Sequence, residues 1–313
     1  MSSSDAPRLL RWWFPTVPAE RLGILRVLVG IYSTIYFGVR LPYWLSFSRH
    51  RPTQFQPVGV LSFADSPFDP VAYQALVLFT FVGSMFFLCG LWYRAVAPLF
   101  AVSLLVVLTY ANSWGGLLHT DNLWLLHVVV LACAPAADVL SLDARRARRA
   151  CPPHFKYGWA VRLMCWVCVC AYFLAGLAKV KNSGWTFVGG DSLRNYVAMD
   201  NVRKIELGSL HSPFAPWVLP YPGPFQFLAF VSLSLELGAP LVILNRRLAR
   251  LWSVAMWAFH VGVFAIMAIL FLYPITFIAF APFFRTERLA PWLRRRFGRE
   301  VAADESTNVL NPS

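Results

Sequence analysis

Apolar runs of roughly 20 residues recur along the whole chain, and they constrain its fold more than any other feature. A helix of that length crosses the hydrocarbon layer of a bilayer. Charged residues make up only 14% of the 313 residues, whereas an ordinary soluble domain carries about 25%. The sequence therefore predicts an all-α fold, a polytopic integral membrane bundle in contact with the lipid bilayer.

The runs predict about eight transmembrane helices. The eighth is short for a full crossing. Together they form one predicted transmembrane domain, residues 22–285, between an interfacial N-terminal segment, 1–21, and a basic then polar cytoplasmic tail, 286–313. The N-terminal segment has a short Trp12-Trp13-Phe14 patch and no long apolar core, so we expect an interfacial anchor and no cleaved signal peptide. The predicted spans are 22–42, 71–91, 95–112, 122–140, 159–179, 225–244, 251–270 and 273–285.

Basic residues are distributed unevenly between the two sides of this arrangement. The N-terminus, the C-terminal tail and the connections on their side hold 18 of the 28 lysines and arginines, and the opposite connections hold 7. Because cytoplasmic loops are enriched in basic residues, both termini are predicted to be cytoplasmic. The same rule accounts for the net charge of +13 without a nucleic-acid partner, since the chain contains no soluble basic module.

The six cysteines indicate neither disulfides nor a metal site. Five lie inside apolar runs, and Cys151 lies in a basic loop. On a helix, Cys165 and Cys168 share a face while Cys170 lies off it, and no histidine or carboxylate adjoins them. We therefore expect packing residues and no metal centre.

Ionisable side chains inside the spans are candidates for function, because burying them in lipid is costly. Arg26 lies one turn into the first span, where it can extend to the cytoplasmic face. Glu236 and His260 lie near the middles of the sixth and seventh spans and are expected to pair, either as a structural clasp or as a proton-handling pair. Lys179 ends the fifth span on the outer side, which is poor in basic residues.

The short outer loop before the fourth span contains His119 and Asp121 at the predicted depth of Lys179. Partial withdrawal of a lysine from water makes a neutral amine available as a base. A neighbouring histidine could stabilise a developing phenolate, and the aspartate could orient that imidazole. These residues form the predicted site.

The order of these motifs resembles a known family. The motifs are an arginine in the first span, the loop from Trp114 to His119, the stretch Phe173-Leu174-Ala175-Gly176-Leu177-Ala178-Lys179, and His260 followed by Tyr273-Pro274. Over residues 18–290 the chain resembles the horizontally transferred transmembrane (HTTM) domain, the membrane part of the vitamin K-dependent gamma-glutamyl carboxylases. The stretch that ends at Lys179 carries the resemblance most specifically.

The resemblance implies a quinol-using enzyme, with vitamin K hydroquinone or a related quinol as cofactor and oxygen and carbon dioxide as co-substrates. Lys179 takes the place of the family's quinol-deprotonating lysine, and His119 that of the histidine supporting the quinol oxygen. Asp121, Asn122 and Trp185 are supporting candidates, together with His260 and Glu236. The animal carboxylases continue into a large extracytoplasmic domain that docks the substrate, so this chain is expected to need a secreted peptide or a separately encoded docking domain. Bacterial members suggest the bacterial cytoplasmic membrane.

Two other functions are consistent with the residues. The chain could be a non-catalytic membrane partner in maturation or export of a secreted peptide, in which case Lys179 and His119 would tolerate substitution. It could also be a transporter with Glu236 and His260 on the pathway, although the sequence has no obvious internal repeat.

Overall fold

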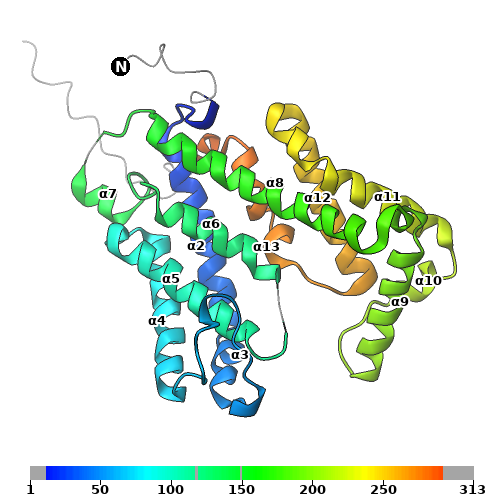
Figure 1. Ribbon diagram of the computed structural model, residues 1–313. Helices are drawn as coiled ribbons and strands as arrows, with labels where there is room; N and C mark the ends of the chain where they lie inside the picture. Colours follow the sequence, from blue (N-terminus) through cyan, green and yellow to red (C-terminus); the bar gives the residue numbers. More distant parts are fainter. Residues whose placement is uncertain (1–11, 117–118, 149, 292–313) are drawn as a thin grey trace, which may run out of the picture.

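The computed structural model describes residues 12–116, 119–148 and 150–291 (Figure 1). Every regular element in these residues is helical, and the one β-type contact is an isolated bridge between Val17 and His154. This confirms the all-α class. Most of the predicted N-terminal segment, residues 1–11, and most of the predicted tail, residues 292–313, lie outside the described residues.

Five helices among the described residues are long and apolar enough to cross a membrane. The fourth of them extends into a 3₁₀ segment, η5 (Gly184–Gly189). Capping residues mark some of the helix boundaries. The Asp69 carboxylate accepts hydrogen bonds from two backbone amides at the start of α4, and Gly90 ends that helix in a left-handed conformation, with φ 62°. The five are α2 (Ala19–Val39), α4 (Pro70–Cys89), α5 (Tyr93–Asn112), α8 (Phe155–Ser183) and α12 (Arg246–Met267).

The other three predicted spans are not single full-length helices in the described residues, so the count of eight spans is not confirmed. The fourth contains only α6 (Asn122–Ala132). The sixth is divided into α11 (Pro222–Leu237) and η6 (Ala239–Leu244), and the eighth into α13 (Leu272–Ile275) and η7 (Ile278–Phe283). The physical reason is proline, which lacks the amide donor that continues a helix. The prolines in these runs are Pro135, Pro240, Pro274 and Pro282.

Shorter helices form the connections. They are α3 (Leu41–Ser46), α7 (Leu142–Ala147), α9 (Asp191–Glu206) and α10 (Ala215–Val218), with single 3₁₀ turns η1 (Phe47–Arg49), η2 (Pro52–Gln54), η3 (Gly59–Leu61), η4 (His119–Asp121) and η8 (Thr286–Leu289). Figure 1 shows the starts of α2 and α8 at one end of the molecule and α3 and the end of α9 at the other.

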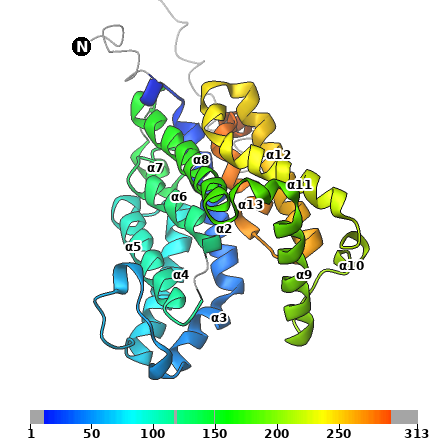
Figure 2. The same cartoon turned by 45° about the vertical axis from the view of Figure 1, so that its right-hand side comes forward.

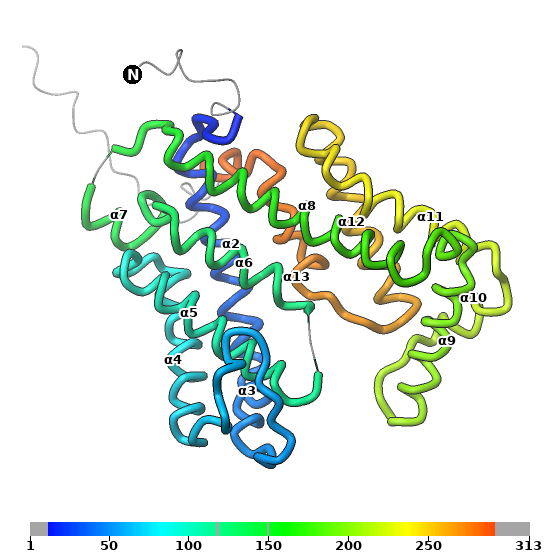
Figure 3. The backbone as a smooth tube through the Cα atoms, viewed as in Figure 1, coloured from blue at the N-terminus to red at the C-terminus, as the bar shows by residue number. Residues whose placement is uncertain are grey.

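The helices pack in a consistent order. α2 contacts α4, α6 and α8, α4 contacts α5, and α6 lies between α5 and α8. α8 then crosses to a second group, where it contacts α11, and α11 contacts α9 and α12 (Figures 2 and 3). The main core lies in the first group and reaches α12 and η7. α8 is therefore the helix that joins the two groups.

Arg26 lies wholly inside the first group, contrary to the expectation that it reaches the membrane surface. Its guanidinium donates to the carbonyls of Phe87 (2.9 Å) and Leu88 at the end of α4. It also donates to those of Ala136 (3.2 Å) and Leu140 (2.5 Å) after α6. Carbonyls at a helix C-terminus have no partner within the helix and favour a cation. Arg26 thus cross-links α2, α4 and the segment after α6.

The predicted orientation can be tested at two exposed positions. Ala147 ends α7, and Ser209 follows α9. Single cysteines at these positions in a cysteine-free background should react with a membrane-impermeant reagent from opposite sides, Ala147→Cys only after the membrane is opened. Labelling of both from the outside of intact cells would contradict the predicted topology.

Candidate active site

Lys179 and Glu236 form an ion pair between α8 and α11. The Nζ atom of Lys179 lies 2.5 Å from Oε1 and 2.6 Å from Oε2 of Glu236. The lysine side chain is 28% exposed and the glutamate side chain only 4%. The expected pairing of Glu236 with His260 was therefore wrong. The pairing was predicted because Glu236 and His260 both lie near the middle of a predicted span. Which neighbouring helix Glu236 faces depends on how each helix is rotated about its axis, and the sequence does not show this rotation.

Gly176 makes this pair possible. Tyr172, Gly176 and Lys179 follow one face of α8 at helical spacing. A β-carbon at Gly176 would lie 2.9 Å from Cβ of Glu236 and 3.2 Å from the backbone nitrogen of Leu237. Only glycine allows α8 and α11 this close approach, which sets the distance between the lysine and the carboxylate.

Replacing Gly176 with alanine should force α8 and α11 apart. We expect a loss of about 1–3 kcal/mol, the usual cost of overpacking, together with loss of whatever activity depends on the ion pair. Thermal unfolding and activity of the purified protein measure the two effects. Gly189→Ala is the matched control, because no atom lies within 4 Å of its added β-carbon. Equal behaviour of the two variants would argue against this role for Gly176.

His260 faces the same region from α12. Its Nε2 atom lies 2.8 Å from the hydroxyl of Tyr172, whereas Nδ1 is buried and has no hydrogen-bond partner among the described residues. Its ring lies 5.0 Å from that of Phe271. A buried imidazole with one free nitrogen is costly unless a ligand satisfies it.

His119 reaches this region from the opposite group of helices. Its exposed ring lies 6.2 Å from the ring of Phe271, so Phe271 lies near both His119 and His260. The structure shows no hydrogen bond or ring contact between His119 and Lys179 in the residues it describes. Lys179 and His119, which were predicted to act together, are therefore not in direct contact in the described residues.

Asp121 lies elsewhere and does not orient His119. Its buried carboxylate accepts a hydrogen bond from the hydroxyl of Tyr36 (3.0 Å), to which Arg40 also donates. Burial raises the pKa of Asp121 because it disfavours the charged carboxylate, and Tyr36 and Arg40 oppose this effect. Asp121 therefore fastens the start of α6 to α2.

Asn122 and Trp185 are both exposed, and Trp185 is 71% exposed. The aromatic rings over Lys179 belong instead to Phe187 and Phe259, whose centroids lie 5.7 Å and 5.8 Å from Nζ. Phe187 is two residues beyond the tryptophan that was singled out from the sequence, and it is buried.

Two polar groups of this region were not predicted from the sequence. Tyr172, the partner of His260, was not among the predicted site residues. His127 is fully buried, with Nδ1 2.7 Å from the Tyr273 hydroxyl and Nε2 3.2 Å from the carbonyl of Met164. A histidine in the apolar run of the fourth predicted span was itself a signal, since ionisable residues in spans are rarely incidental.

The donor groups suit an aromatic hydroxyl compound better than a metal. The described residues contain no group of three or more histidine, cysteine, aspartate or glutamate side chains placed to hold an ion. The same region offers a lysine, a free imidazole nitrogen and the rings of Phe259 and Phe271. Aromatic walls with a few polar atoms are typical of sites for small ring compounds. A quinol is consistent with this set.

The fold defines a multi-pass membrane protein of the all-helical class. The family model of the HTTM domain matches residues 14–288, nearly the whole chain, and the chain belongs to this family. Comparison with curated proteins gives no match, and neither does comparison with solved structures. The HTTM domain relates the chain to the membrane domain of vitamin K-dependent carboxylases.

Proposed function

We propose that this protein is a membrane enzyme of the vitamin K-dependent carboxylase type, in which Lys179 removes a proton from a quinol hydroxyl. The ion pair of Lys179 with the nearly buried Glu236 is the observation that supports it most. Perturbed, poorly hydrated ionisable pairs are characteristic of catalytic sites. The family membership makes quinol chemistry the natural candidate.

Glu236 has a specific part in this proposal. A lysine can act as a base only as a neutral amine. Charges are poorly solvated in a site with little water. The free energy of the ion pair there approaches that of the neutral pair, in which the amine has given its proton to the carboxylate. Glu236 can therefore take a proton from Nζ of Lys179 over the short distance between them. The amine is then free to accept the proton of the quinol hydroxyl.

His260 and His119 would hold the oxygen that loses its proton. Tyr172 fixes the ring of His260 through Nε2 and leaves Nδ1 able to meet a quinol oxygen. His119 also lies near Phe271, and the ring of Phe271 can pack against an aromatic ring. Asn122 and Trp185, both exposed, are proposed only as outer contacts of the substrate.

When bound, a quinol such as vitamin K hydroquinone would supply all four electrons that reduce oxygen, two from its oxidation to the quinone level and two from the ring double bond that becomes the epoxide, so that the products are the quinone epoxide and water. Carboxylation would also require carbon dioxide and a glutamate residue of a secreted peptide, presented directly or by a separately encoded docking domain. We place the protein in the bacterial cytoplasmic membrane, with this site at the outer face.

The test is formation of epoxide from vitamin K hydroquinone by the purified protein in lipid nanodiscs under oxygen, followed by chromatography. Glu236→Gln should lower the rate about 10- to 100-fold, as expected for losing a hydrogen bond between charged groups. Glu206→Gln, at the exposed end of α9, should leave the rate unchanged. Absence of epoxide with wild-type protein, or equal rates for both variants, would contradict the proposal.

The surface of α9 favours a second candidate, a membrane partner that assists a secreted peptide without catalysis. Four exposed apolar residues lie three positions apart on this helix, which is not among the five candidate spans: Tyr196, Met199, Val202 and Ile205. Exposed apolar patches commonly mark interaction sites. In this case Val202→Ser should reduce secretion of the peptide, whereas Lys179→Ala should not.

A further inference from the structure

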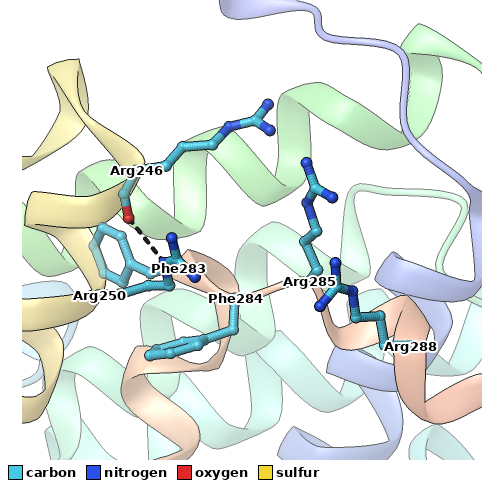
Figure 4. A pocket seen from close by; sticks show the side chains of 6 residues that line it. All are labelled: Arg246, Arg250, Phe283, Phe284, Arg285 and Arg288. Atoms are coloured by element: carbon cyan, nitrogen blue, oxygen red, sulfur yellow. Dashed lines mark hydrogen bonds between the residues drawn. The ribbon is translucent and has the colours of Figure 1, made fainter.

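Arginines from distant parts of the sequence meet around a cavity at the start of α12. The cavity measures about 410 Å³ and lies between the start of α12 and the segment formed by η7 and η8. Figure 4 shows its lining: Arg246, Arg250, Phe283, Phe284, Arg285 and Arg288. More than 30 residues of sequence separate Arg250 from Arg285, so the fold brings these charges together.

The four arginines have no acidic partner within ion-pair distance among the described residues. Arg250 donates only to the backbone carbonyl of Arg246, at 3.2 Å, and the other three guanidinium groups donate to no described residue. Like charges held around one cavity repel each other, and an anion bound there relieves that repulsion.

A smaller cavity of about 120 Å³ adjoins the first one and is lined by further arginines. It shares Arg246, Phe283 and Arg285 with the first and adds Arg21 and Arg162. Nη2 of Arg21 donates to the carbonyl of Pro282 at 3.0 Å, and Nε lies 3.8 Å from the carboxylate of Glu287. Arg162 lies over the ring of Trp12 at 4.4 Å.

Of the six arginines, Arg21 alone has a carboxylate within 4 Å in the described part of the chain. Nε of Arg21 is also buried without a hydrogen bond. The retention of basic residues on the cytoplasmic side explains their presence on this face. It does not require them to converge on one cavity. This convergence, together with a buried Arg21 nitrogen that makes no hydrogen bond, indicates a binding site.

We infer that this arginine cavity binds a phosphate-bearing anion. Guanidinium groups bind phosphate oxygens through paired hydrogen bonds, which lysine cannot reproduce. Phe283 and Phe284 give the same cavity an apolar side, which suits a ligand that joins a phosphate to hydrocarbon. Basic cavities of this kind between membrane helices bind phospholipid headgroups. We therefore assign the site to the headgroup of an anionic phospholipid, which combines a phosphate with hydrocarbon. Free phosphate would match the arginines but not the two phenylalanines.

The test uses the full-length protein, delipidated in neutral detergent, and measures binding of short-chain phosphatidylglycerol, phosphatidylcholine and inorganic phosphate. Phosphatidylglycerol should bind at least about tenfold more tightly than phosphatidylcholine, since charged hydrogen bonds contribute that much. Competition by inorganic phosphate at similar concentrations would support the phosphate site and assign it to a free anion. Equal binding of the two lipids without phosphate binding would overturn the inference.

Two double variants distinguish binding in the cavity from a general effect of positive surface charge. Arg246→Gln with Arg285→Gln should weaken phosphatidylglycerol binding about tenfold or more. Arg94→Gln with Arg247→Gln removes the same charge from exposed positions outside the cavity and should leave binding unchanged. If the first pair prevents folding, as judged by thermal unfolding, the single change Arg288→Gln takes its place. Identical weakening in both sets would overturn the assignment.

Discussion

Replacement of Lys179 with alanine is expected to abolish quinol oxidation, with a fall in rate of roughly 10²- to 10⁴-fold, the usual contribution of a general base. The variant keeps the helix, because alanine is a good helix former and the lysine lies near the end of α8. Added small primary amines should restore part of the rate, since they can occupy the space left by the side chain. Epoxide formation in nanodiscs measures both effects.

Two further variants make this result specific. Lys179→Arg should also be inactive, because a guanidinium stays protonated and cannot serve as a base. Lys181→Ala removes an exposed lysine side chain two residues further along α8, and it should behave as wild type. Activity in the arginine variant would show that Lys179 has only a charge-pairing role with Glu236.

The second large effect is expected at Arg26, and it concerns stability. Arg26→Met would leave the carbonyls of Phe87, Leu88, Ala136 and Leu140 without their donor inside the protein. Breaking a buried charged network typically costs about 3–5 kcal/mol. We expect the variant to unfold at much lower temperature or to be degraded in cells.

Arg26→Lys should rescue little of this loss, since an ammonium group cannot reach four carbonyls with the geometry of a guanidinium. Arg94→Met is the control, because Arg94 is exposed on α5 and forms no hydrogen bond with a described residue. Unfolding midpoints in detergent, followed by intrinsic fluorescence, compare the three variants. A midpoint for Arg26→Met close to that of the control would rule out the cross-linking role.

Much of the candidate site could be predicted from residue type and position. Lys179 stood out because a lysine at the end of an apolar run needs an explanation, and the stretch before it resembles the family motif. Glu236 and His260 stood out for the same reason. Their partners could not be predicted, because a helix can turn any face to its neighbour. Contacts such as that at Gly176 decide which face is turned.

The length of the helices was predictable only in part. An apolar run shows that a segment can enter the membrane, and α2, α4 and α5 follow their runs closely. Pro135, Pro240 and Pro274 lie in runs that are just as apolar, and hydropathy takes no account of the amide donor that a proline lacks. The fourth and sixth segments were therefore predicted as full helices, whereas the eighth, which contains Pro274, was already predicted to be short.

By itself, the sequence determined the helical membrane class, the family and the presence of ionisable groups inside the apolar runs. These properties depend on composition and local order, which the chain carries in any conformation. The tertiary structure alone decided that Glu236 meets Lys179, that Arg26 is buried and that arginines from α12 and η8 share one cavity. The physical reason is that these contacts join residues far apart in the chain, so they exist only after the helices have packed and fixed each other's rotation.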